Sequence, residues 1–96
     1  MYLLFYDIKE NNIRTKVSKL LEREAYERIQ FSVFIGVTNP KHFSIWKKLN
    51  DLLKDTPNNR LYCLRIPREN FYNIKIIGNF GLDLKYLAGD KSSLII

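Results

Sequence analysis

The first eight residues constrain the fold of this chain more than any other segment does. Residues 1–8 are nearly all apolar, and in an extended backbone their hydrophobic side chains fall on both faces. A strand that buries both faces belongs in the interior of a sheet, with partners at each edge. We therefore expect a central strand here, with Asp7 as the acidic residue near its end.

Two segments with a helical spacing of apolar residues are present downstream of this strand. Asn11 and Asn12 can cap the first, and Asn39 followed by Pro40 is typical of the start of the second. Residues 56–59 (Thr-Pro-Asn-Asn) end the second helix. The apolar positions expected to face the core are Ile13, Val17, Leu20, Leu21 and Ala25 in the first helix and Phe43, Trp46, Leu49 and Leu53 in the second.

Strand character returns between the helices and after them. Residues 28–37 alternate in hydrophobicity, residues 60–66 form a short β-like segment closed by Pro67, and residues 73–77 form another. Together with the helices, these segments predict an α+β fold in which two helices cover one face of a mainly antiparallel sheet.

Length and charge limit the classes of function. The 96 residues allow a single domain with a thin core, so area buried against a second copy would help it. One cysteine and one histidine exclude a disulfide framework and a zinc set. Without a signal-peptide or membrane-spanning pattern, we expect a cytoplasmic protein. The net charge of +6 favours contact with a polyanion, and the apolar end Leu94–Ile96 favours docking on a partner.

Asp7 is the most informative candidate for chemistry. A carboxylate at the end of an apolar strand is a typical functional position, although it can also support the N-terminus of the following helix electrostatically. One carboxylate suffices for Mg²⁺ when water and phosphate oxygens supply the other ligands. A twofold dimer would bring two copies of Asp7 together.

A scattered basic set accompanies this acid. Arg14, Lys16 and Arg28 are candidates for phosphate contacts, whereas the lysines of the second helix are interpreted as a solvated face. No glycine-rich phosphate loop is present.

The uncharged candidates have competing interpretations. Phe34 could stack on a base, fill a dimer interface or pack in the core, and Tyr6 and Cys63 are interpreted as core residues. Ser32 lacks the partners of a catalytic triad, since His42 is the chain's one histidine and belongs to another element.

Three blocks of sequence, taken together, resemble the CRISPR-associated endonuclease family Cas2. They are the run Tyr-Leu-Leu-Phe-Tyr-Asp-Ile at residues 2–8, Arg14-x-Lys16-Val17, and the run Arg-Ile-Gln-Phe-Ser-Val-Phe at residues 28–34 followed by Gly36. Ile76-Ile77-Gly78 also looks like that family, and the resemblance spans nearly the whole chain.

The resemblance implies a ferredoxin-like α+β fold and a homodimer. Residues 1–96 would form one domain, with a core over 1–78 and a C-terminal segment, 79–96, that docks on the dimer mate or another partner. Residues 73–77 would be an accessory strand that crosses onto the second subunit. The fold also requires the run 28–37 to bend or break near Phe31-Ser32 into two strands.

The resemblance further implies a metal-dependent nuclease. Paired Asp7 residues would hold Mg²⁺ or Mn²⁺ and act on RNA or DNA; Arg14, Lys16 and Arg28 would bind the backbone. Tyr6, Ser32 and Phe34 fall on supporting positions of the family. Two departures are Lys16, where some relatives have Arg, and Phe31, which replaces a common Tyr.

Two other functions stay open at this point. Some members of the family act as non-catalytic bridges that hold the DNA prespacer in a complex with the CRISPR integrase, Cas1. A small regulatory or toxin-like domain of the same fold, in which Asp7 is only structural, is a third alternative.

Overall fold

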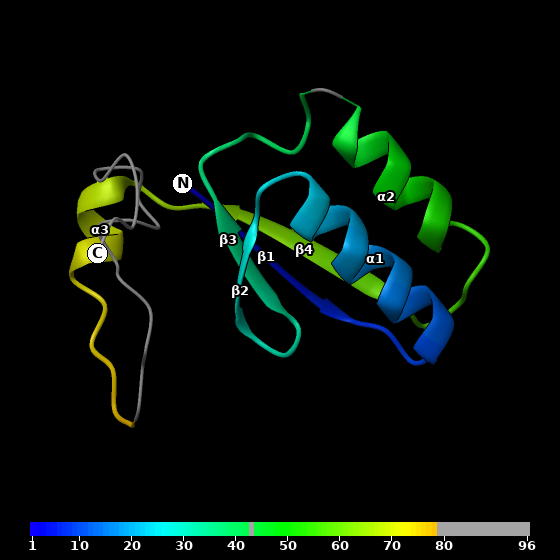
Figure 1. Cartoon of the computed structure of the whole chain (residues 1–96), viewed down its shortest axis with the longest axis horizontal. Helices are drawn as coiled ribbons and strands as arrows, with labels where there is room; N and C mark the ends of the chain where they lie inside the picture. Colours follow the sequence, from blue (N-terminus) through cyan, green and yellow to red (C-terminus); the bar gives the residue numbers. More distant parts are fainter. Residues whose placement is uncertain (43, 79–96) are drawn as a thin grey trace.

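The fold alternates strands and helices around one antiparallel sheet. The structure is a computed structural model that describes residues 1–42 and 44–78. Its elements are β1 (Tyr2–Asp7), α1 (Asn11–Arg23), β2 (Glu27–Gln30), β3 (Val33–Gly36), α2 (Ile45–Leu53), β4 (Arg60–Arg65) and α3 (Arg68–Tyr72). The strand order is β2-β3-β1-β4, and α1 and α2 lie side by side on one face (Figure 1). This βαββαβ arrangement is the ferredoxin-like α+β fold expected from the sequence.

β1 is a central strand, as predicted from its apolar sequence. It pairs antiparallel with β3 on one side, where Leu4 faces Phe34, and with β4 on the other, where Asp7 faces Arg60. Its even-numbered residues Leu4 and Tyr6 are buried beneath the helices. Asp7 therefore leaves the strand on the opposite face of the sheet, which we call the open face.

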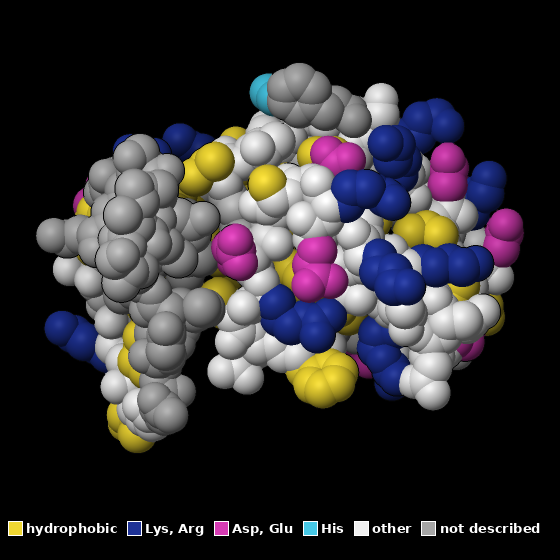
Figure 2. Space-filling view, in the orientation of Figure 1, with side chains coloured by type: hydrophobic (Ala, Val, Ile, Leu, Met, Phe, Trp, Pro, Cys, Tyr) yellow, Lys and Arg dark blue, Asp and Glu magenta, His cyan; other side chains and the backbone are white. Residues whose placement is uncertain are grey.

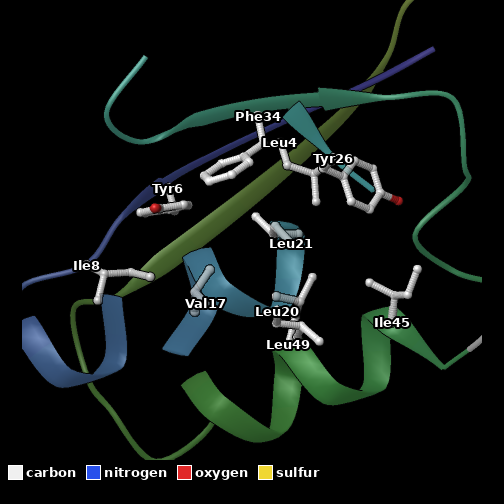
Figure 3. Packing of buried hydrophobic residues seen from close by; sticks show 10 residues of the cluster. All are labelled: Leu4, Tyr6, Ile8, Val17, Leu20, Leu21, Tyr26, Phe34, Ile45 and Leu49. Atoms are coloured by element: carbon white, nitrogen blue, oxygen red, sulfur yellow. The ribbon is translucent and has the colours of Figure 1, made fainter. Parts of the chain in front are cut away.

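The main core lies between the sheet and the two long helices. Figure 3 shows apolar side chains of β1, β3, α1 and α2 converging there. Leu4, Val17, Leu21 and Phe34 are completely buried. The other buried members of this cluster are Tyr6, Ile8, Leu20, Tyr26, Ile45 and Leu49. Among the described residues, the helix positions predicted to face the core therefore do so, with one exception. Ala25 lies beyond the end of α1 in a left-handed conformation (φ 69°).

The alternating run 28–37 is two strands, as the ferredoxin-like fold required. β2 and β3 are joined by a turn at Phe31-Ser32, and a register irregularity lies between Arg28 and Gln30. The turn separates residues that a single strand would keep on one face, so Phe31 is 77% exposed while Ile35 is buried.

The starts of both long helices differ from the expectation. Asn11 and Asn12 lie inside the first turn of α1, and Glu10 occupies the position before it. Asn59 ties this entry to the start of β4, because its side chain accepts a hydrogen bond from the Lys9 amide (2.8 Å) and donates one to Glu10 (2.6 Å). α2 begins at Ile45, because the segment after Asn39 first forms turns.

The segment after β4 departs furthest from the sequence prediction. Residues 68–72 form α3, which was not expected, and residues 74–78 form no strand within this single chain. The crossing of residues 73–77 onto a second subunit stays a prediction. Phe71 of α3 is buried against Ile35 on the open face, and Met1, Leu3, Ile29 and Ile66 pack around the pair. The predicted docking segment 79–96, including Leu94–Ile96, and Phe43 lie outside the described residues. Within the described part of the chain, no helix is long and apolar enough to cross a membrane.

Candidate functional site

Asp7 is the last residue of β1 and projects an accessible carboxylate from the open face. Its side chain is 69% exposed, and α3 covers the other end of this face. Phe5, two residues earlier on the same face, stacks on Tyr62 of β4 with ring centroids 4.9 Å apart. The acid therefore lies at the uncovered edge of an aromatic surface.

Two cations lie close to this carboxylate. The Lys9 ammonium is 3.3 Å from an Asp7 oxygen, in an exposed ion pair of the kind that contributes little to stability. Arg60, the cross-strand neighbour of Asp7, shares its face. No group of three potential metal ligands occurs among the described residues. In the described part of the chain, the site at Asp7 thus offers a divalent ion a single carboxylate.

Arg14 and Arg28 meet around Tyr6 on the helix side of the sheet. They line a hollow of about 230 Å³ whose other walls are Tyr6, Thr15, Ser18 and Phe31. The Arg14 guanidinium donates a 3.0 Å hydrogen bond to the carbonyl of Ile8, next to Asp7. The Arg28 guanidinium lies 5.1 Å from the centre of the buried Phe34 ring. Two of the three predicted cations therefore share one site near the end of β1.

The titration of Tyr6 reflects this charged environment. Burial raises the pKa of the Tyr6 hydroxyl, while the positive charges of Arg28 and Arg14 oppose that shift. Tyr6 is also packed against Phe34, as predicted for a core residue, with ring centroids 6.2 Å apart. Tyr6 therefore contributes a buried phenol to the lining of the hollow, under the influence of both arginines.

Lys16 does not join Arg14 and Arg28. It lies with Lys19, Arg23 and Lys48 around a second hollow, of about 460 Å³, between α1 and α2. Lys16 therefore lies apart from the other two cations, and its predicted role in nucleic-acid binding stays a prediction. Asp7 itself also leaves the sheet on the face opposite to Arg28, whose cross-strand partner is the helix-facing Phe34.

The groove between α1 and α2 is a basic surface that the sequence reasoning missed. We call it the basic groove, because four basic side chains and only one acid line it over the apolar Leu20 and Leu52. The charged lining residues are Lys16, Lys19, Arg23, Lys48 and Asp51. Figure 2 shows basic side chains gathered over the two helices. The signal was present, since residues 16, 19, 20 and 23 repeat at the spacing of one helix face. Lys48 was interpreted as part of a solvated face, and here it helps to line a concave surface.

Phe34 and Ser32, the other two residues on supporting positions of the family, have structural roles. Phe34 is completely buried, which excludes base stacking and a dimer contact and leaves core packing. The Ser32 carbonyl accepts a 3.1 Å hydrogen bond from the Tyr6 amide, so the β2–β3 turn is fixed to the end of β1. Burial raises the pKa of the Cys63 thiol, consistent with a packing role.

Comparison with known proteins gives consistent matches. The family described as "CRISPR associated protein Cas2" matches residues 1–74. A protein of Chloroflexus aurantiacus named CRISPR-associated endoribonuclease Cas2 1 is 37% identical over 81% of this chain and 84% of its own length. CRISPR-associated endoribonuclease Cas2 2 of Methanospirillum hungatei is 38% identical over 65% of this chain and 70% of its own.

The fold has a match among solved structures as well. The crystal structure of a hypothetical protein from Thermus thermophilus superposes with a TM-score of 0.66 at 25% sequence identity. The superposition covers 84% of this chain and 93% of that one. The family match covers the part of the chain that carries Asp7, Arg14 and Arg28.

Proposed function

The chain belongs to the CRISPR-associated protein Cas2 family, and from that premise we propose that it is a metal-dependent endonuclease of RNA or DNA that works in the cytoplasm during spacer acquisition. The observation that carries the proposal is the exposed carboxylate of Asp7, which ends the central strand on the uncovered part of the open face. Relatives named endoribonucleases support a phosphodiester substrate.

A second copy of the chain completes the site in this proposal. Phe5, Tyr62 and Asp7 lie on the part of the open face that α3 leaves uncovered, and Tyr62 is 46% exposed. A twofold axis through this surface would bury the aromatic pair and bring the two Asp7 carboxylates toward each other. Exposed Ile74, Ile76 and Ile77 after α3 support a contact of the same kind with the partner.

The residues at Asp7 fit a magnesium ion that keeps most of its water. The carboxylate is accessible, and its one ion-pair partner among the described residues is Lys9, an exposed ammonium whose contact is easily given up. Two such carboxylates would hold Mg²⁺ or Mn²⁺. When bound, the ion supplies polarisation of a phosphate oxygen and a more acidic water.

The chain's own cations bind and orient the substrate. Lys9 and Arg60 on the face of Asp7 attract phosphates to the carboxylate's edge. Arg14 and Arg28 lie across the end of β1, and the planar guanidinium groups suit phosphate contacts. The hydrogen bond from Arg14 to the Ile8 carbonyl keeps this second site at a fixed position relative to Asp7.

Replacement of the acid tests the proposal. Asp7→Asn is expected to lower cleavage of labelled RNA or DNA in Mg²⁺ by at least about 100-fold, because it removes the anionic ligand while keeping the size of the side chain. Asp55→Asn is the matched control, since it makes the same change at an exposed acid after α2. Chelation of the metal should reproduce the Asp7→Asn result in the unmodified protein. Cleavage that survives Asp7→Asn unchanged would overturn the assignment.

The basic groove favours a second candidate function. We propose as the alternative that the protein is a non-catalytic bridge that holds nucleic acid in a complex with the CRISPR integrase, Cas1. The four cations of this hollow, Lys16, Lys19, Arg23 and Lys48, outnumber its one acid, Asp51, and suit it to a phosphate backbone. The groove is independent of Asp7, because it lies between the two helices.

Charge neutralisation in the groove distinguishes this alternative. Lys16→Gln combined with Lys48→Gln is expected to weaken duplex binding and to flatten its salt dependence by about two counterions. Lys41→Gln with Lys75→Gln is the control, because these two exposed lysines are not among the groove's lining residues. Equal losses in both double variants would refute a specific role for the groove.

A further inference from the structure

An exposed aromatic ring stands beside the two arginines of the Tyr6 hollow. Phe31, in the turn between β2 and β3, is 77% exposed, although its ring is large and apolar. The Arg28 guanidinium lies 5.8 Å from the centre of this ring and 5.1 Å from that of Phe34. Hydrophobic and basic surfaces meet at the lower edge of Figure 2, where Figure 1 shows the β2–β3 turn.

The two rings position the Arg28 guanidinium at the mouth of the hollow. Phe34 is buried, whereas Phe31 faces solvent, so the cation contacts one buried ring and one accessible ring. Among residues 1–42 and 44–78, no carboxylate forms a salt bridge with Arg28 or Arg14. Their hydrogen-bond donors are available to an anion, apart from the one that Arg14 gives to the Ile8 carbonyl.

The size of the hollow indicates which part of a ligand it accepts. Its volume of about 230 Å³ is below the roughly 300–1,000 Å³ of pockets that enclose a whole small ligand. Tyr6, Thr15 and Ser18 also line it, but the Thr15 and Ser18 hydroxyls donate to the carbonyls of Asn11 and Thr15, so the two arginines are the main donors for an anion. A phosphate group matches this lining, and a base attached to it would extend outward, where Phe31 lies.

We propose that Phe31 is a stacking platform for an unpaired nucleobase whose adjoining phosphate is bound by Arg28 and Arg14. This inference rests on the proposed function for the presence of a nucleic acid and adds that the site accepts single strands. In a duplex both faces of each internal base are already stacked, so the ring of Phe31 gains no partner there. RNA and DNA share the π-face that the ring recognises.

The two arginines and Phe31 are expected to have different effects on binding. Arg28 and Arg14 would bind any phosphate, so their loss weakens single-strand and duplex binding alike and reduces the salt dependence. Phe31 would act only on an exposed base, so its loss weakens single-strand binding selectively. The ratio of the two affinities therefore reports on the ring.

Binding of defined oligonucleotides by the full-length protein tests the proposal. The probes are fluorescein-labelled oligo-U, oligo-dT and a DNA duplex, each of about 12 nucleotides or base pairs, measured by anisotropy in chelator so that cleavage does not intervene. Phe31→Ala is expected to weaken single-strand binding by about 5- to 100-fold, the range that stacking on one base provides, and to leave duplex binding within about twofold.

Variants that differ in aromaticity identify the interaction. Phe31→Trp should retain single-strand binding, and Phe31→Leu should lose it as Phe31→Ala does, because leucine keeps apolar area without a flat ring. Tyr72→Ala in α3, where the ring is 37% exposed and absent from the hollow, is the control for loss of a surface aromatic. An abasic oligonucleotide should bind the unmodified protein and Phe31→Ala equally.

The outcomes also separate this inference from the proposed function. Single-strand binding that is indifferent to Phe31 overturns the inference and leaves the nuclease assignment intact. Binding that depends on Phe31 without any Mg²⁺-dependent cleavage supports the inference and removes the nuclease. A fall in molecular mass by light scattering on Phe31→Ala would show that the ring belongs to a contact between copies, and this also overturns the inference.

Discussion

The side chain of Tyr26 links the end of α1 to the loop after β3. Its hydroxyl donates a 2.6 Å hydrogen bond to the Thr38 carbonyl, and its ring lies directly against Gly36. A Cβ at position 36 would be 2.5 Å from Tyr26 Cδ1, so the close approach of ring and backbone requires glycine there. Burial raises the pKa of this phenol well above the ordinary value of 10.0.

This raised pKa predicts a loss of stability in alkali. Above about pH 10 the unfolded chain releases the Tyr26 proton while the folded chain retains it, so the free energy of unfolding should fall as pH rises. Tyr26→Phe should cost about 1 kcal/mol at pH 8 through the lost hydrogen bond. From about pH 9 to about pH 11, however, the variant should lose less stability than the unmodified protein.

Urea unfolding across this pH range measures the effect. The difference between the two proteins isolates Tyr26, because the lysines and other tyrosines are common to both. Parallel stability curves would show that the Tyr26 phenol titrates as it does in the unfolded chain. Tyr6, whose pKa is also raised by burial, adds a fall in the same direction to both curves.

Single residues also show where sequence reasoning succeeded at the candidate site. Asp7 was identified because a charge at the end of an apolar strand stands out in sequence, and it is exposed as expected. Lys16 lies apart from Arg14 because it follows Arg14 by two positions in a helix, which turns it to a different side. For Phe34, periodicity left core and surface roles equally open, and only tertiary packing could decide between them.

At the scale of elements, β1, α1 and β4 could be predicted because each carries an unbroken pattern. The β2–β3 hairpin could not be read from periodicity alone, since residues 28–37 continue one alternation through the turn. The family resemblance, which demanded two strands, corrected that interpretation. α3 was missed because five residues contain too little periodicity to indicate a helix.

α3 nevertheless carries a large share of the packing on the open face. Phe71 is 1% exposed and closes the apolar cluster around Ile35. We predict that Phe71→Ala lowers the free energy of unfolding by about 3–5 kcal/mol, because it removes a buried ring and leaves a cavity. Tyr72→Ala, at the exposed neighbour, should cost far less.

Chemical unfolding and limited proteolysis together test this role of α3. A detached α3 would be cleaved near residues 67–73 at protease concentrations that spare the unmodified protein. Unchanged stability combined with unchanged proteolysis would show that Phe71 does not hold the segment in place.

At the scale of the whole molecule, the sheet is covered unevenly. Among the elements that the structure describes, α1 and α2 cover one face, while α3 covers only one end of the other. The remainder of the open face exposes 54% of Leu64 and 46% of Tyr62, next to Phe5 and Asp7. A domain this small gains stability from burying such a surface, and the surface includes the proposed catalytic acid.

This arrangement predicts that assembly and cleavage depend on the same surface. Tyr62→Asp places a charge opposite Phe5, so it is expected to convert a dimer at micromolar concentration into a monomer and to abolish Asp7-dependent cleavage. Asn12→Asp makes the same change of charge in the exposed first turn of α1 and should leave both properties intact. Light scattering and cleavage assays on the same samples provide the two measurements.

Duplex binding in the basic groove is a control for the effect of Tyr62→Asp on dimerisation and cleavage. Because the groove lies between α1 and α2, each monomer carries a complete copy, and duplex binding by Tyr62→Asp should lose only the avidity that two linked copies provide. If Tyr62→Asp is monomeric but still cleaves at the normal rate, then one Asp7 suffices and the paired-carboxylate site is wrong. If the unmodified protein is itself monomeric at micromolar concentration, the open face must be covered in some other way, and the proposed site loses its second half.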